Sequence, residues 1–140
     1  MNGEQGVYIA PDSADFLALL GTDYTGYFDA LGFDFRRLAG ARVLSIAGRD
    51  AYAYADFVAS TQSGNYLDHG VRVNSAFSSY RISGTDFSQR FGDIAGPAFP
   101  DLDTLEMRVV LANASAPETV TIPFLTSYIG GVDFQDKDDL

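Results

Sequence analysis

Residue types that perform chemistry are sparse in this chain, and its single histidine is the first to consider. His69 is the only histidine, Lys137 is the only lysine, and there is no cysteine. A serine nucleophile needs a neighbouring base, usually a histidine that is itself oriented by an acid. No Gly-x-Ser-x-Gly elbow accompanies His69, and Lys137 lies in an acidic C-terminal tail. The sequence therefore predicts no catalytic residue.

Carboxylates are abundant but dispersed along the chain. Of the 19 acidic residues most are aspartates, and the segment 101–103, with Asp101 and Asp103, is the one to compare with a calcium loop. That segment lacks the glycine and the terminal glutamate of a calcium loop. Helix caps, turns and solvated charge account better for most of the aspartates. We therefore expect no metal ion and no other cofactor.

The segment 64–74 holds the densest cluster of polar and aromatic side chains. A binding loop would draw on Tyr66, His69, Arg72 and Asn74. In the alternative interpretation the segment is a packed loop, in which the last three side chains hydrogen-bond to neighbouring backbone. The sequence alone leaves both interpretations open.

Composition and charge limit the classes of partner. The chain has 140 residues, of which 46% are hydrophobic, and its net charge is -10. A surface that binds phosphates needs clustered Lys and Arg, so nucleic acid and anionic membranes are poor partners. No run approaches the roughly 18 apolar residues of a membrane span, and the first ten residues do not read as a signal peptide. We expect one soluble domain over residues 1–132 and a frayed acidic tail over 133–140.

Hydrophobic periodicity predicts an α+β architecture with short elements. Apolar spacing and flanking glycines favour helices over residues 13–20 and 23–31. The unit with the most regular pattern is a strand over 41–47, a glycine turn and a helix over 50–60 that Asp50 caps. Residues 6–10 read as a short strand, and residues 64–100 read as mostly loop with short elements because five glycines interrupt the pattern.

Near the C-terminus, two segments alternate with period two and predict an antiparallel hairpin. The segments cover residues 105–111 and 120–124, and a turn over 113–117 joins them. Pro123 cannot donate to a strand ladder, so it should lie at a sheet edge or a strand end. Asn113 begins a glycosylation sequon in that turn, which matters only if the protein is secreted.

Four stretches, taken in order, resemble the PDZ-like domain of fungal tail-specific serine peptidases, which are related to the chlamydial protease-like activity factor. They are residues 7–11, 24–32, 38–54 and 64–75. The strand that ends in Ile46-Ala47-Gly48 is similar to the PDZ strand that reads Ile-Asn-Gly or Ile-Asp-Gly. Ala47 departs from that pattern and removes a turn-forming side chain.

The resemblance implies a fold and a function. The fold would be α+β and PDZ-like, with a small, mostly antiparallel sheet or partly open barrel and two or three short helices. The chain would be a secreted, non-catalytic regulatory or peptide-binding module, and its partners would be a peptide segment or the peptidase core outside this chain. Residues 30–33 look like the Gly-Leu-Gly-Phe loop that captures a chain terminus, although they follow a predicted helix. This similarity makes Gly32 and Phe33 candidate binding residues.

Two rival functions remain open from the residues. The first is a stand-alone protein whose aromatic surface binds an apolar ligand, which a large pocket lined by Tyr and Phe would favour. The second is a small lyase or cyclase that uses His69 with a carboxylate, which would require those groups to converge in a cleft.

Overall fold

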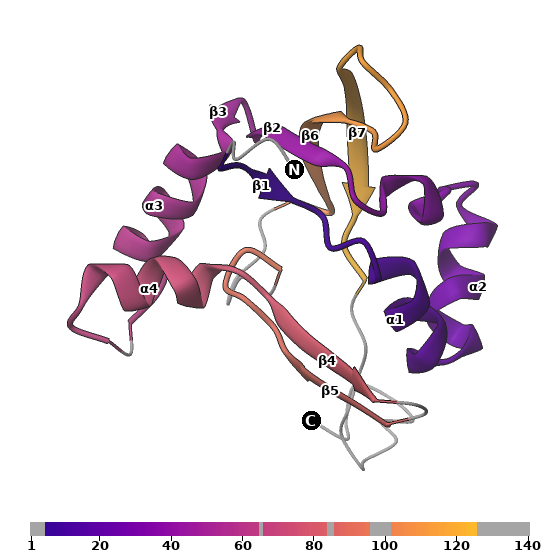
Figure 1. Cartoon of the computed structure of the whole chain (residues 1–140), viewed down its shortest axis with the longest axis horizontal. Helices are drawn as coiled ribbons and strands as arrows, with labels where there is room; N and C mark the ends of the chain where they lie inside the picture. The colour runs from indigo at the N-terminus through magenta and orange to yellow at the C-terminus, as the bar shows by residue number, and fades with distance from the viewer. Residues whose placement is uncertain (1–4, 65, 84–85, 96–101, 126–140) are drawn as a thin grey trace, which may run out of the picture.

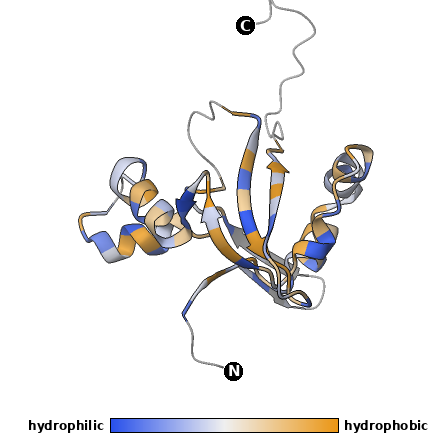
Figure 2. Cartoon of the chain, turned by 90° about the horizontal axis from the view of Figure 1, so that it is seen from above, coloured by the Kyte–Doolittle hydropathy of each residue, from blue (hydrophilic) through white to orange (hydrophobic). Residues whose placement is uncertain are grey.

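The structure, a computed structural model, describes residues 5–64, 66–83, 86–95 and 102–125. These residues form an α+β fold with a five-stranded antiparallel sheet, a separate two-stranded hairpin and four α-helices (Figure 1). Helices α1 and α2 lie on one side of the sheet and helices α3 and α4 on the other (Figures 1 and 2). The predicted α+β class is correct. The predicted tail over 133–140 lies outside the described residues.

The sheet is open and runs in the order β1, β2, β6, β7. Its members are β1 (Val7–Tyr8), β2 (Arg42–Ile46), β6 (Thr104–Val110) and β7 (Glu118–Pro123), and the short β3 (Arg49–Asp50) pairs with the end of β2. The two strands predicted near the C-terminus pair as expected, with Met107 opposite Val120. Pro123 is the last residue of the edge strand β7, which confirms its predicted position.

The predicted strand–turn–helix unit is also confirmed. Strand β2 turns through Ala47 and Gly48, whose φ angles are 48° and 76°, into β3 and then α3 (Ala51–Thr61). Two consecutive positive φ angles are the signature of a type I′ hairpin turn. The Asp50 carboxylate accepts hydrogen bonds from the N–H groups of Tyr52 and Ala53, at 3.0 and 3.2 Å, as the N-cap of α3.

Three helical segments connect β1 to β2. They are α1 (Ser13–Leu20), α2 (Thr22–Ala30) and the 3-10 helix η1 (Phe35–Leu38). The bounds of α1 and α2 lie within one residue of the prediction, and Gly21 separates the two helices. Three aromatic rings, those of Phe28, Phe33 and Phe35, pack together with centroid distances of 5.7 and 5.5 Å. This aromatic packing joins α2 to η1.

The prediction for residues 64–100, mostly loop with short elements, did not specify the three elements that form there. They are α4 (His69–Ala76) and the antiparallel hairpin of β4 (Ser79–Ser83) and β5 (Asp86–Arg90). Helix α4 also makes four α-helices where two or three were expected. Its buried face consists of small residues, Ser75 and Ala76, so the sequence carries no apolar stripe to reveal it. The Asp68 carboxylate accepts a hydrogen bond from the Val71 N–H as the N-cap of α4, and an aspartate at that position indicates a helix start in the sequence.

The core lies where β2, β6 and β7 meet η1 and the start of α3. Its fully covered members are Leu38, Ala41, Val43, Ile46, Ala51, Val109 and Val120. Val43 and Ile46 come from β2, and Val109 and Val120 come from the C-terminal hairpin. Tyr54 is only half-buried and packs against this cluster from α3. Along the C-terminal hairpin, Val109 and Val120 are therefore buried in the core, and Leu105, Met107 and Ile122 pack against it.

Candidate binding cavity

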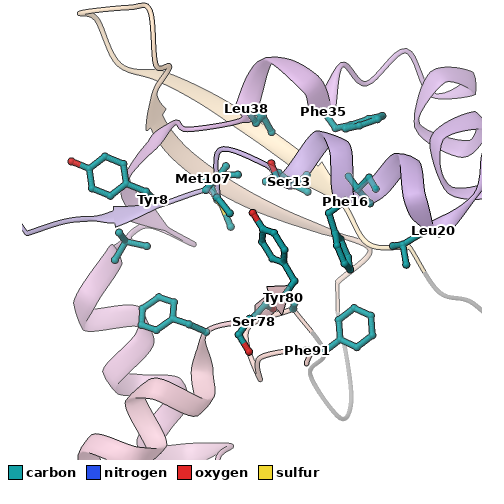
Figure 3. A pocket seen from close by; sticks show the side chains of 18 of the residues that line it. Tyr8, Ser13, Phe16, Leu20, Phe35, Leu38, Ser78, Tyr80, Phe91 and Met107 are labelled. Atoms are coloured by element: carbon teal, nitrogen blue, oxygen red, sulfur yellow. The ribbon is translucent and has the colours of Figure 1, made fainter. Parts of the chain in front are cut away.

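An apolar cavity of about 710 Å³ lies between the sheet edge and the β4–β5 hairpin. Residues of β1, α1, α2, η1, α3, β4, β6 and β7 line it, together with loop residues between these elements. Figure 3 shows Tyr80 of β4 pointing up into this space toward Ser13 and Met107, with Phe16 beside it. Segments far apart in the sequence therefore build one site.

The described lining residues are strongly apolar. Nine of them are aromatic: Tyr8, Phe16, Phe28, Phe33, Phe35, Tyr52, Phe77, Tyr80 and Phe91. Polar groups come only from tyrosine and serine hydroxyls and the backbone, and no described lining residue carries a charge. Phe91 is 67% exposed and Tyr8 is 51% exposed, so aromatic surface remains open to solvent here. Such a lining favours a neutral, apolar ligand.

Tyr80 connects the hairpin to α1. Its ring lies 5.0 Å from the ring of Phe16, which is buried in α1. Burial raises the pKa of the Tyr80 hydroxyl, and the carboxylates of Asp12 and Asp15 raise it further, whereas a hydrogen bond with the Asp12 backbone lowers it. The hydroxyl is therefore neutral at physiological pH and available as a donor or acceptor.

Strand β1 offers an unpaired backbone edge next to the cavity. Among the described strands it pairs only with β2, and Val7 and Tyr8 lie opposite Val43 and Arg42. Since the Ile9 N–H donates to Ala41 O at 2.9 Å, alternation along an antiparallel strand turns the N–H and C=O of Tyr8 away from β2. Tyr8 therefore presents one donor and one acceptor at the outer edge.

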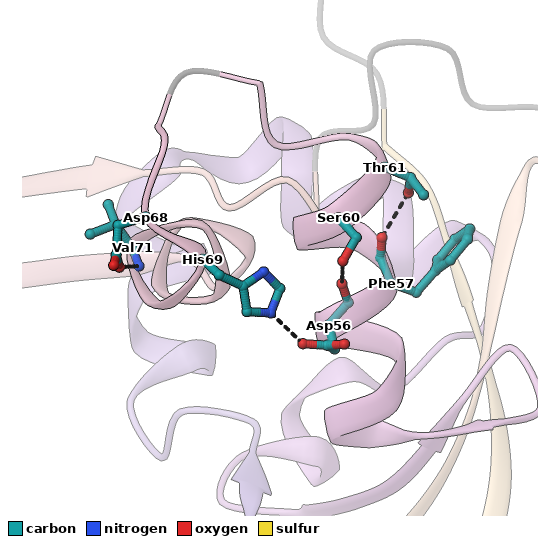
Figure 4. Close-up of polar contacts among 7 residues, drawn as sticks. All are labelled: Asp56, Phe57, Ser60, Thr61, Asp68, His69 and Val71. Carbon is teal, nitrogen blue, oxygen red and sulfur yellow. Dashed lines mark hydrogen bonds and ion pairs between the residues drawn. The ribbon is translucent and has the colours of Figure 1, made fainter.

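Most of the predicted binding residues lie elsewhere, around α3 and α4 (Figure 4). His69 Nε2 contacts Asp56 Oδ1 at 2.6 Å, and the two side chains are 55% and 62% exposed. The Arg72 guanidinium donates to the backbone oxygen of Tyr66. The alternative of a packed segment is thus right for Arg72, whereas His69 bonds to a side chain.

The remaining predicted binding residues lie in different parts of the molecule. Asn74 lies exposed on α4, and Gly32 lies exposed at the end of α2. Phe33 is the one predicted binding residue that lines the cavity. Residues such as Tyr80 and Phe91 were missed because their segment was read as loop. The only sequence signal for the cavity was the high total of 8 Tyr and 11 Phe.

The loop over 30–33 does not offer free backbone donors. The N–H of Leu31 donates to Tyr27 O, that of Gly32 to Asp29 O, and that of Phe33 to Phe28 O, at 2.9 to 3.1 Å. These bonds close the C-terminus of α2, where Gly32 takes a φ of 66°. A chain terminus would have to displace all three.

The geometry does not assemble hydrolytic or metal chemistry in the part of the chain that the structure describes. The His69–Asp56 pair lies on an open surface and does not line the cavity. Within the described ranges, no group of three or more His, Cys, Asp and Glu side chains could hold a metal ion. None of the described helices is long and apolar enough to cross a membrane.

Comparison with protein-family models, with curated proteins and with solved structures found no match to this chain.

Proposed function

We propose that this chain is a non-catalytic, PDZ-like binding module of a tail-specific serine peptidase, and that it holds an extended peptide along the outer edge of β1. The observation that carries the proposal is the unpaired edge at Tyr8 directly beside an apolar cavity. A peptide strand added there would use main-chain hydrogen bonds for affinity and the cavity for side-chain selection.

The fold supports this proposal in two ways. The strand–turn–helix unit over β2, β3 and α3 is the best-defined part of the resemblance, and it forms with a capped helix. In α3 the hydroxyl of Ser60 donates to the backbone oxygen of Asp56 at 2.7 Å, while His69 Nε2 contacts the Asp56 carboxylate, so these hydrogen bonds do not pair the hydroxyl with the imidazole. The isolated chain should therefore leave an unstructured protein such as casein intact.

The backbone edge can be tested with two substitutions at one position. Tyr8→Pro removes the outward N–H while leaving the bonds to β2 in place, and Tyr8→Ala keeps the N–H but removes the ring. The probe is a rhodamine-labelled peptide, acetyl-Lys-Thr-Phe-Thr-Val-Thr-Lys-amide, whose apolar side chains share one face. Its binding is followed by fluorescence anisotropy.

We expect the peptide to bind the parent chain and to lose about tenfold or more in affinity with Tyr8→Pro, a larger loss than with Tyr8→Ala. Circular dichroism of both variants establishes that they are folded. Absence of binding to the parent, or equal binding to the parent and Tyr8→Pro, would contradict the proposal.

A second candidate function is favoured by the cavity volume. A space of about 710 Å³ with nine aromatic residues in its lining falls within the size range of small-molecule pockets. The chain would then be a stand-alone protein that binds a neutral apolar ligand. Binding of 1-anilinonaphthalene-8-sulfonate or N-phenyl-1-naphthylamine that survives Tyr8→Pro, together with no peptide binding, would select this alternative.

A further inference from the structure

The chemistry around the cavity specifies which part of a polypeptide the site can accept, an inference that rests on the proposed function. Capture of a chain terminus requires free backbone N–H groups or a cation to hold the carboxylate. The loop over 30–33, the one segment similar to a carboxylate-binding loop, has its last three N–H groups already bonded within α2 and its C-terminal turn.

Four of the arginine side chains are engaged or directed elsewhere. Arg36 pairs with Asp29 at 3.0 Å, and Arg37 pairs with Glu118 at 2.9 Å. Arg90 donates to Ser75 O at 3.3 Å and also to its hydroxyl. Arg81 follows Tyr80 in β4, so alternation along the strand sends its side chain to the face opposite the cavity.

Two carboxylates lie at the start of α1, beside the cavity. Helix α1 begins beside it, and Ser13 from its first turn lines the space. The N-terminus of a helix attracts anions, but Asp12 and Asp15 place two carboxylates at this one. Both carboxylates contribute to the raised pKa of Tyr80, whose side chain lines the cavity. A terminal carboxylate placed here would be repelled by these two carboxylates.

We propose that the site beside β1 binds an internal extended segment of a polypeptide rather than a chain terminus, with a neutral aromatic or aliphatic side chain in the cavity and basic residues at its flanks. The free strand edge accepts a backbone that continues in both directions. The uncharged lining selects the apolar side chain, and Asp12 and Asp15, in a chain of net charge -10, favour Lys or Arg alongside.

Three peptides test this inference. The first is the internal-segment probe, acetyl-Lys-Thr-Phe-Thr-Val-Thr-Lys-amide. The second ends at Val with a free carboxylate, acetyl-Lys-Thr-Phe-Thr-Val-OH. A third peptide, acetyl-Lys-Thr-Phe-Thr-Val-amide, has the same length as the second and isolates the terminal charge. Affinities are measured by isothermal titration calorimetry at low salt, where surface charges act most strongly.

We expect the amide to bind at least threefold more tightly than the free acid of the same length. In Asp15→Asn this preference should shrink, whereas it should persist in Asp23→Asn, which alters the equivalent first-turn acid of α2 away from the cavity. Tighter binding of the free acid would overturn the inference and leave the proposed function standing. No binding of any of the three peptides would overturn the proposed function itself, and the inference with it.

Discussion

The core of the sheet and the wall of the cavity are built from similar apolar residues but are held in different ways. Val43, Ile46 and Val109 are at most 6% exposed and interlock between β2, β6 and α3. Across the cavity, the β4–β5 hairpin is fixed by the Tyr80–Phe16 ring contact and by polar bonds at its base. The first region buries its apolar surface against itself, and the second keeps apolar surface available.

The base of the hairpin shows how polar contacts replace packing. The Arg90 guanidinium donates to Ser75, the Ser63 hydroxyl donates to the Asp93 carboxylate, and the Gly92 N–H donates to Ser78 Oγ at 2.9 Å. Ser63 and Ser75 are both 6% exposed, so their bonds satisfy buried polar groups. Such a network can position the hairpin without filling the space beneath it, which is what a binding site requires.

The largest expected difference between the two regions is the cost of deleting an apolar side chain. Ile46→Ala should lower the free energy of unfolding by about 2 to 5 kcal/mol, because it leaves a cavity among packed neighbours. Phe91→Ala should change it by no more than about 0.5 kcal/mol, since that ring is 67% exposed. Urea denaturation of both variants measures the contrast, and equal losses would show that the cavity wall is packed as tightly as the core.

An intermediate effect is expected at the turn before α3, the one place in the described core region where a residue other than glycine takes a positive φ. Ala47 has a φ of 48°, a conformation that disfavours a Cβ and that Asn tolerates better. Ala47→Asn should therefore raise the free energy of unfolding by about 0.5 to 1 kcal/mol. Gly48→Ala is the opposite control and should lower the free energy of unfolding, because the φ of 76° disfavours a side chain although an added Cβ would meet no neighbouring atom. A neutral or destabilising Ala47→Asn would mean that the turn is not type I′.

The smallest effect concerns the cavity wall and appears only at alkaline pH. Because the folded state raises the pKa of Tyr80 above its ordinary value of 10.0, the folded chain keeps this proton after the unfolded chain has lost it. The stability that Tyr80 contributes is therefore complete below pH 10 and declines as pH rises through the raised pKa. In Tyr80→Phe, the free energy of unfolding should not show this part of the decline above pH 10.

The comparison is made by urea denaturation of the parent and Tyr80→Phe at pH 8 and pH 11. All other tyrosines are shared, so the difference between the two proteins reports on Tyr80 alone. An identical loss of stability in both proteins would show that Tyr80 is not enclosed between the hairpin and α1.

Elements whose signals are local could be predicted from the sequence. The helix that begins after Asp50 and the C-terminal hairpin follow from capping, turn chemistry and alternation within a dozen residues. Helix α4 could not be recognised in the same way, because Gly70 and small buried residues replace an apolar stripe. Its stability comes from packing on α3 rather than from its own pattern.

The amino-acid sequence by itself determined the α+β class, the scarcity of catalytic groups, and the strand–turn–helix unit. Only the tertiary structure decided where a ligand could bind. The cavity is lined by residues from Gly6 to Ile122, and no periodic pattern of neighbouring residues predicts that these side chains come together. The polar cluster around His69, which was conspicuous in sequence, folds onto the far side of α3, while Phe33 reaches the cavity from the end of α2. Binding sites of this kind depend on long-range packing, which a pattern of neighbouring residues cannot specify.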